Sequence, residues 1–300
     1  MTTLLKSNYS LGTRFWAYLQ LMRPANIVTA WADILTGFAA SGAALESPLA
    51  WLLLATTGLY GGGVVFNDVF DAELDAIERP ERPIPTGKAS RQGATILGIV
   101  LLTIGIVAAA QVSLLSAVIA AFVAIGAIVY DAWNKHNAVI GPINMGLCRG
   151  GNLLLGVSAT SAMVGERWFL ALIPIFYIAA VTAISRGEVH GGKSSTGKLA
   201  LILLAIALGG VLGLGLLPNY FIFAALPFLA LLTARVLPPF IAATYDPSAD
   251  IIRRAVKTGV LSLILLDASI AAGFAGWLYG LLVLSLLFVS ITLAKIFAVT

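Results

Sequence analysis

The chain has 300 residues, of which 59% are hydrophobic and only 11% are Asp, Glu, Lys or Arg, and its mean hydropathy is +0.97. Soluble domains carry roughly 25% charged residues, so this composition excludes a water-soluble globular protein. The formal charge of +4 does not indicate nucleic-acid binding, because the cations are scattered along the chain and form no basic face.

Apolar stretches long enough to cross a bilayer follow one another along the whole chain. A helix needs about 20 apolar residues to cross roughly 30 Å of hydrocarbon at about 1.5 Å per residue. The sequence therefore predicts one domain over residues 1–300, an all-α polytopic membrane helix bundle of nine or ten transmembrane helices. The ten predicted spans are residues 15–43, 49–66, 92–110, 114–130, 138–160, 167–184, 199–217, 220–238, 256–274 and 277–297. The breaks between them include Ser47-Pro48, Gly165-Glu166, Pro238-Pro239 and Gly276.

Lysine and arginine residues are unequally divided between the two faces of the predicted bundle. When alternate breaks are assigned to opposite faces, 16 of the 18 fall on the face that carries both termini, Lys6 among them. Arg167 lies on the other face and Arg149 lies within a span. By the positive-inside rule both termini are cytoplasmic, which favours an even number of helices. We expect a multi-pass protein of a bacterial inner membrane, with its first span retained because residues 1–14 lack a signal-peptide pattern.

The polar segment after the second span carries four residues with metal-binding chemistry: Asn67, Asp68, Asp71 and Asp75. If helix continues through this segment, Asn67, Asp71 and Asp75 share one face, and Asp68 stands three residues before Asp71. Mg²⁺ usually takes one or two carboxylates and leaves its other positions to water or phosphate oxygens. A solvated acidic surface is the alternative interpretation of such a run. The pattern favours these four residues as ligands of Mg²⁺ on a diphosphate.

A proline-rich loop follows the acidic segment at once, in the sequence Arg79-Pro80-Glu81-Arg82-Pro83-Ile84-Pro85-Thr86-Gly87. It presents two arginines beside the acidic helix end. Arginine matches phosphate oxygens bidentately, so this loop is expected to help hold an anionic ligand.

These two motifs together resemble the first aspartate-rich motif and trailing loop of the UbiA superfamily of intramembrane prenyltransferases. The resemblance extends to Arg23-Pro24-x-Asn26 and to Lys135, where the family often has Tyr-x-x-x-Lys. Tyr130 stands one residue too far from Lys135, so only the lysine is carried over. The resemblance implies a helix bundle around a cavity open to lipid, in which the aspartates hold Mg²⁺ on the diphosphate of an isoprenoid donor.

The second acidic motif of that superfamily, two acids four residues apart after the sixth helix, is reduced in this chain. Aligned on the glycines, Glu188 takes the place of the second acid and Ile184 that of the first. With Arg23-Pro24-Ala25-Asn26 and the stretch from Glu188 to Gly192, the chain most resembles the EboC-like branch. His190 is expected to be an ordinary loop residue.

Three charged residues, Asp33, Arg149 and Asp267, stand well inside apolar spans. An unpaired charge there costs at least roughly 2.5 kcal/mol, so each is expected to face the bundle interior. Both a substrate-facing role and a buried structural Asp-Arg pair fit this pattern. Cys148, the only cysteine, is expected to be a packing residue.

The function implied by the resemblance is Mg²⁺-dependent transfer of an isoprenyl group from an isoprenyl diphosphate to an unidentified small-molecule acceptor within the bilayer. A non-catalytic isoprenoid or metabolite carrier is the first alternative, supported by the missing acid at Ile184. An ion-coupled transporter is the second. The residues expected to act on the leaving group are Lys135, Arg82 and Glu188. Those expected to bind the isoprenyl diphosphate are Asn26, Arg79 and Arg149.

Overall fold

Helices account for all regular structure in the computed structural model, which describes residues 9–44, 48–135 and 137–297. Lys6 lies outside the described residues. In chain order the elements are α1 (Leu11–Leu21), α2 (Pro24–Ser41), α3 (Pro48–Phe70), α4 (Ala72–Glu78), α5 (Arg91–Ala110), α6 (Leu114–Val129), the π-helix η1 (Tyr130–Asn134), α7 (Ile140–Val157), α8 (Ser161–Arg167), the 3₁₀ helix η2 (Trp168–Ala171), α9 (Leu172–Ser185), α10 (Ser194–Gly213), the 3₁₀ helix η3 (Leu214–Leu216), α11 (Ile222–Tyr245), α12 (Ala249–Ala275) and α13 (Trp277–Ala294). The predicted all-α class is confirmed.

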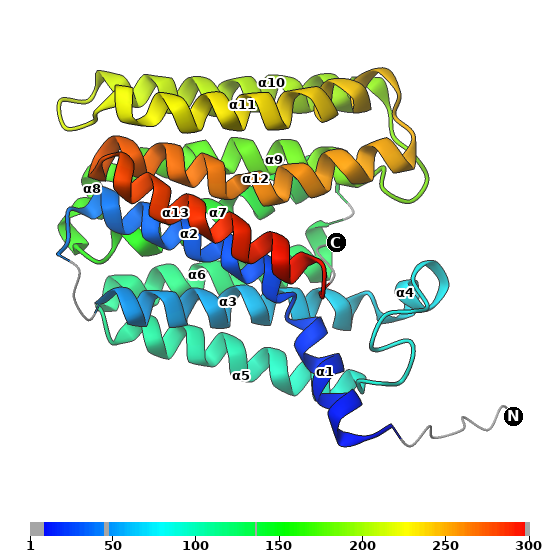
Figure 1. Cartoon of the computed structure of the whole chain (residues 1–300). Coiled ribbons are helices and arrows are strands. Elements are labelled where there is room, and N and C mark those ends of the chain that lie inside the picture. The colour runs from blue at the N-terminus through cyan, green and yellow to red at the C-terminus, as the bar shows by residue number, and fades with distance from the viewer. Residues whose placement is uncertain (1–8, 45–47, 136, 298–300) are drawn as a thin grey trace, which may run out of the picture.

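Eight helical segments in the described part of the chain are long and apolar enough to cross a membrane, so this is a multi-pass integral membrane protein. Helices α2 and α7 each have 18 residues and run alongside these segments in the bundle (Figure 1). They are less apolar because they carry Asp33 and Arg149. The ten predicted spans correspond to the eight segments together with α2 and α7.

The first predicted span, residues 15–43, is not one helix. It breaks at Arg23, whose φ of 48° is the only positive value at a described non-glycine residue. Pro24 begins α2 and keeps the preceding residue out of the right-handed helical conformation. The break turns α1 away from α2 at the end of the bundle near α4 (Figure 1). The arginine side chain is thereby placed between the start of α2 and the end of α3.

Two other predicted breaks are also wrong in detail. Helix α11 continues through Pro238-Pro239 to Tyr245, because its packing against α10 and α12 stabilises the helix where the prolines remove two hydrogen bonds. Gly165-Glu166 lies within the short helix α8. The break at Gly276 is confirmed, and its φ of 87° suits a glycine between α12 and α13.

Glycine allows α2 and α7 to pack closely in the middle of the bundle. A side chain at Gly37 would place its Cβ only 2.1 Å from the carbonyl oxygen of Leu153, and one at Gly156 would lie 2.5 Å from the carbonyl oxygen of Ile34. Small residues permit such backbone approach between membrane helices. The approach brings the polar residues of α7 against those of α2.

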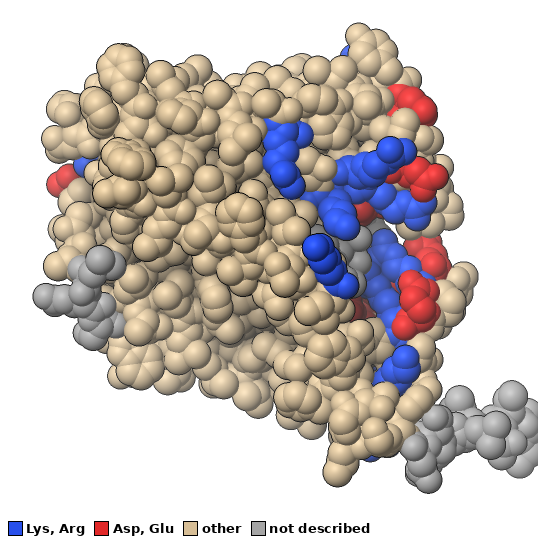
Figure 2. All heavy atoms as spheres, viewed as in Figure 1, with Lys and Arg blue, Asp and Glu red and all other residues tan. Residues whose placement is uncertain are grey.

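Charged side chains gather at the end of the bundle where α4 lies, around a depression in the surface, and the long side seen in Figure 2 is mostly uncharged. The long helices carry many exposed apolar side chains, such as Ile99, Phe122 and Phe288. Lipid would cover such surfaces at little cost. An ionic ligand would therefore be admitted at the charged end.

Candidate functional site

A cavity of about 560 Å³ is enclosed mainly by α2, α3, α4, α6, η1, α7, α9 and α12, and it reaches the charged end of the bundle. Its inner wall is mostly apolar and includes Leu59, Val123, Met145, Ile178 and Leu263. Among the described residues, six Lys and Arg side chains and five Asp and Glu side chains line it. A cavity with this division suits a ligand that has an anionic head and an apolar body.

The acidic segment keeps helical register across a small break, as its spacing predicts. Helix α3 ends at Phe70, Asp71 has a φ of −84° and a ψ of 0°, and α4 begins at Ala72. Backbone hydrogen bonds nevertheless join Asp71 N to Asn67 O at 3.0 Å and Asp75 N to Asp71 O at 2.7 Å. Asn67, Asp71 and Asp75 therefore share one face, and all three line the cavity.

Asp68 differs from these three because it is not among the residues that line the cavity. Its Oδ1 accepts from Arg23 Nη2 at 2.6 Å and from Arg82 Nη1 at 3.1 Å, and the residue is 5% exposed. Arg82 Nη1 also donates to Asp75 Oδ2 at 2.8 Å. Burial raises the pKa of the Asp75 carboxyl, and the Arg82 charge opposes that shift. The proline-rich loop is thus fastened to both ends of the acidic segment.

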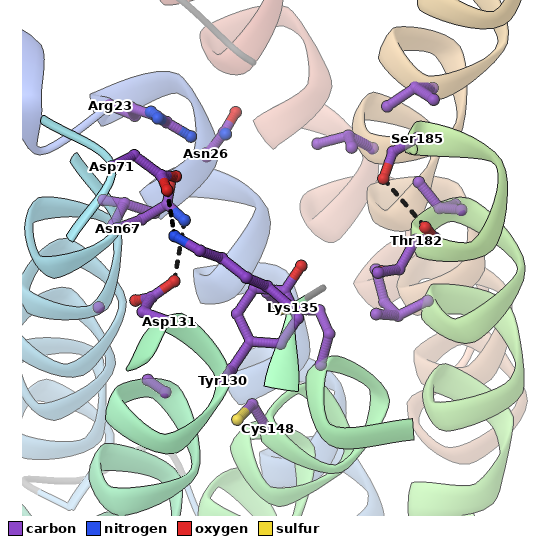
Figure 3. A pocket seen from close by; sticks show the side chains of 18 of the residues that line it. Arg23, Asn26, Asn67, Asp71, Tyr130, Asp131, Lys135, Cys148, Thr182 and Ser185 are labelled. Atoms are coloured by element: carbon purple, nitrogen blue, oxygen red, sulfur yellow. Dashed lines mark hydrogen bonds and ion pairs between the residues drawn. The ribbon is translucent and has the colours of Figure 1, made fainter. Parts of the chain in front are cut away.

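Lys135 lies across the cavity mouth from α4 and donates a hydrogen bond from Nζ to Asp71 Oδ1 (Figure 3). The lysine follows directly after the π-helix η1. Its ammonium group is largely buried, with 11% of the side chain exposed. An ammonium group on an apolar stem can exchange one oxygen partner for another with little movement of the backbone.

The π-helix corrects the expectation that Tyr130 is out of register with Lys135. Lys135 N donates to Tyr130 O at 2.9 Å, a hydrogen bond between residues five apart. The wider turn absorbs one extra residue, so both side chains line the same cavity (Figure 3). The signal that could have revealed this is the five-residue spacing itself, because single π turns inside membrane helices insert one residue.

Asp131 was also missed by sequence reasoning. It is 4% exposed, lines the cavity, and its Oδ1 accepts from Asn67 Nδ2 at 2.8 Å (Figure 3). Nothing in the sequence spacing pairs it with Asn67, because the two residues are 64 positions apart.

The opposite wall of the cavity is formed by the end of α9 and the turn after it. Thr182 and Ser185 face the first motif across the cavity, and Ser185 Oγ donates to Thr182 O at 3.0 Å (Figure 3). Ile184 is instead 4% exposed and packs in the main apolar core. The alignment that gives Ile184 the place of the missing acid therefore points to a core position.

Glu188 lines the cavity from the turn after α9. Its Oε1 is buried and has no hydrogen-bond partner among the described residues. Burial raises the pKa of Glu188, and the charge of Arg79, which also lines the cavity, is the largest influence opposing this shift. An unsatisfied, buried carboxylate oxygen at a cavity wall is suited to a cationic or hydrogen-bonding ligand.

The intramembrane charges form a pair below the cavity mouth, as one of the two sequence interpretations expects. Arg149 Nε lies 2.7 Å from Asp33 Oδ2, and Arg149 Nη2 donates to Thr29 O at 2.5 Å. Asn152 Nδ2 also donates to Asp33 Oδ2, at 2.8 Å. Arg149 and Asn152 still line the cavity. Asp267 is 1% exposed, so all three predicted charges face the bundle interior.

The remaining predicted residues divide between the cavity and the surface. Asn26, in the first turn of α2, lines the cavity, and so does Cys148. His190 has an 83% exposed side chain, 3.7 Å from Glu78 Oε1, in keeping with an ordinary loop residue.

The acidic and amide side chains of the cavity fit a metal ion only if a bound diphosphate supplies further oxygen ligands. No three His, Cys, Asp or Glu residues in the described ranges lie close enough to hold a metal ion between them. The cavity does present the amide of Asn67 and the carboxylates of Asp71 and Asp75 on one wall, with the unsatisfied Glu188 Oε1 on another. Because Mg²⁺ needs only one or two carboxylates when phosphate oxygens and water complete its shell, these residues fit a Mg²⁺-diphosphate.

Comparison with known sequences identifies a family. Residues 26–244 match the model of the UbiA prenyltransferase family. A digeranylgeranylglyceryl phosphate synthase of Methanothrix thermoacetophila is 35% identical over 184 residues, which make up 61% of this chain and 67% of that relative.

Two solved structures share the fold. A structure of digeranylgeranylglyceryl phosphate synthase in membranes has a TM-score of 0.66 at 21% identity, covering 87% of this chain and 98% of that chain. A UbiA homologue from Archaeoglobus fulgidus, bound to GPP and Mg²⁺, has a TM-score of 0.60 at 19% identity, covering 85% of this chain and 99% of that chain. At these identities the likeness establishes the fold.

Proposed function

The chain belongs to the UbiA prenyltransferase family and is a membrane prenyltransferase, and from this premise we propose that its cavity binds an isoprenyl diphosphate with Mg²⁺. The observation that carries the proposal is the single cavity in which Asn67, Asp71, Asp75 and Glu188 meet Lys135 and an apolar inner wall. The A. fulgidus homologue, which binds GPP and Mg²⁺, supports this assignment.

Asn67, Asp71, Asp75 and Glu188 are the residues that would hold the metal, whereas Asp68 would position Arg23 and Arg82. Of the four ligands expected from sequence, this proposal keeps Asn67, Asp71 and Asp75 and replaces Asp68 with Glu188. When bound, Mg²⁺ would neutralise charge on the diphosphate oxygens. Asp68 contributes indirectly through its two hydrogen bonds. Arg23 ties the break before α2 to the end of α3, and Arg82 ties the proline-rich loop to the same place.

Cations around the cavity mouth would stabilise the leaving group. Lys135 would exchange Asp71 for a diphosphate oxygen, and Arg79 and Arg82 would face the same group from the loop after α4. Negative charge grows on the diphosphate as its bond to the first isoprenyl carbon breaks, so cations held there favour the transition state. Arg149 is already paired with Asp33, which makes it a less direct participant at the inner end of the cavity.

The apolar inner wall would hold the isoprenoid tail and exclude water. The reaction breaks the bond between the first isoprenyl carbon and the diphosphate oxygen, and a nucleophilic atom of the acceptor bonds to that carbon and loses a proton. Residues such as Ile178, Val181 and Leu263 offer no nucleophile to an electron-poor carbon. The acceptor therefore captures it in place of water.

Several finer assignments are part of this proposal. The names of the relatives support a long isoprenoid donor and a lipid-like acceptor. Placement in the EboC-like branch remains a prediction, because the relative described above is a digeranylgeranylglyceryl phosphate synthase.

We assign residues 1–300 to one domain, since Trp16 of α1 stacks on Phe297 beyond α13 with ring centroids 4.9 Å apart. We place the protein in a bacterial inner membrane with both termini cytoplasmic.

The decisive experiment incubates the purified protein with Mg²⁺, a labelled isoprenyl diphosphate and a membrane-lipid extract as the acceptor source. Release of pyrophosphate together with a labelled lipid product supports the proposal. Tight Mg²⁺-dependent binding without release would identify a carrier. A lack of any interaction with the diphosphate would overturn the assignment of this cavity.

A further inference from the structure

An asparagine in a metal site has two chemically different ends. Only the amide oxygen of Asn67 can bind a cation, because the amide nitrogen carries two hydrogens and has no lone pair available. An isolated asparagine at the end of α3 could present either end to the cavity. Whatever orients this amide therefore governs whether Asn67 can act as a ligand.

Asp131 provides that orientation in the structure. Asn67 Nδ2 donates to Asp131 Oδ1 at 2.8 Å, so Asn67 Oδ1 is directed away from Asp131 (Figure 3). A carboxylate has acceptors only, which makes the reverse orientation of the amide unfavourable because two oxygens would then face each other. Asp131 is 4% exposed, so water competes little for this hydrogen bond.

The π-helix explains how an acid reaches this place. Asp131 is the second residue of η1, directly after the apolar helix α6, and it lies on the cavity wall beside α3. The wide turn lets Tyr130 and Lys135 line the cavity together with Asp131. The local distortion thus gathers three polar side chains at the first motif.

We propose that Asp131 is a positioning residue that holds the Asn67 amide with its oxygen toward the bound metal-diphosphate. This inference rests on the proposed function. Groups that orient metal ligands typically change metal affinity by about 10-fold to 100-fold when they are removed. Asp131 would act in this way without touching the metal itself.

The test measures metal binding directly, by electron paramagnetic resonance of Mn²⁺ titrated into the purified protein with inorganic pyrophosphate. Asp131→Asn is expected to weaken Mn²⁺ binding about 10-fold, because an amide can present either its oxygen or its nitrogen to Asn67. Glu78→Gln serves as the matched control. It removes another cavity-lining acid that contacts His190 and not Asn67, and it should leave Mn²⁺ affinity within about twofold of wild type.

A charge exchange separates positioning from a general structural role. The double variant Asn67→Asp with Asp131→Asn restores one donor and one acceptor, with a carboxylate oxygen now directed to the cavity. It should recover most of the Mn²⁺ affinity lost in Asp131→Asn. Unchanged affinity in Asp131→Asn, or no recovery in the folded double variant, would overturn the inference. Failure of the wild type itself to bind Mn²⁺ with pyrophosphate would overturn the proposed function first.

Discussion

At the scale of single residues, the first motif is organised by ion pairs that a ligand must rearrange. Asp68 is shared by Arg23 and Arg82, whereas Asp71 forms its ion pair with Lys135 within the described part of the chain. The two acids therefore have different roles. Asp68 holds its arginine partners at the edge of the site, whereas Asp71 lines the cavity, where a ligand can reach it. Sequence reasoning identified both acids but could not separate them, since one partner of Asp68, Arg23, stands 45 residues away in the chain.

Replacing Asp71 tests this division. Asp71→Asn keeps the shape of the side chain and loses its charge, so Mg²⁺-dependent binding of a labelled isoprenyl diphosphate should weaken at least about 10-fold. The control is Glu73→Gln, two residues away on α4, whose 91% exposed side chain pairs with Arg91 outside the cavity. Calorimetric titration should give a wild-type diphosphate affinity for Glu73→Gln and a weakened affinity for Asp71→Asn. Equal affinity of Asp71→Asn and wild type at limiting Mg²⁺ would favour the alternative interpretation, in which the segment is a solvated acidic surface.

The wall opposite the first motif gives a second prediction. Ile184→Asp would bury an unpaired carboxylate in the apolar core, so the melting temperature in detergent should fall by several degrees or more. Ser185→Asp would instead add a carboxylate that faces the first motif across the cavity (Figure 3), and Mg²⁺-dependent diphosphate binding should strengthen. Scanning fluorimetry and binding assays separate the two effects. Stronger binding in a fully stable Ile184→Asp variant would show that the sequence alignment places the missing acid correctly.

At the scale of elements, the predictable features are those set by local sequence. Apolar runs and Gly276 mark helix bodies and ends, and the spacing from Asn67 to Asp75 predicts a shared helical face. The continuous helix through Pro238-Pro239 depends on packing against other helices, which linear spacing does not report. The π-helix was missed because the five-residue spacing from Tyr130 to Lys135 does not fit the ordinary α-turn that sequence reasoning assumes.

The role of the π-helix can be tested by changing the number of residues between Tyr130 and Lys135. Deleting Trp133, which is 72% exposed, would leave Tyr130 and Lys135 four residues apart, the spacing at which an ordinary α-turn keeps them on one face. Pyrophosphate release should then remain within about 10-fold of wild type. Inserting one alanine after Trp133 would rotate Lys135 about 100° away from Asp71, and turnover should fall about 100-fold or more. Equal activity of the two variants, measured in the same assay, would refute a positioning role for the π-helix.

At the scale of the whole molecule, the sequence predicts that a charged cavity exists but not all of the residues that line it. Sequence motifs indicated acids and arginines near one membrane face, and the structure places them at the mouth of one cavity. The packing of α3, η1 and α9 adds Asp131, Thr182 and Ser185 to the lining of this cavity. No sequence spacing connects these residues to the acidic segment, because the helices that carry them lie more than 40 residues apart along the chain.

The arrangement of charge across the molecule predicts its orientation in the membrane. The charged side chains gather at the end of the bundle that holds α4 (Figure 2), and the stacking of Trp16 on Phe297 brings α1 against the segment that follows α13. By the positive-inside rule we expect this end to be cytoplasmic, with the cavity mouth open toward the cytoplasm. Fluorescent and alkaline-phosphatase reporters fused to either terminus should report a cytoplasmic location, and a reporter inserted at Gly276 should report the opposite side. An external signal from the C-terminal fusion would mean that α12 and α13 do not both cross the membrane, and the charged mouth of the cavity would then need another route for its ligand.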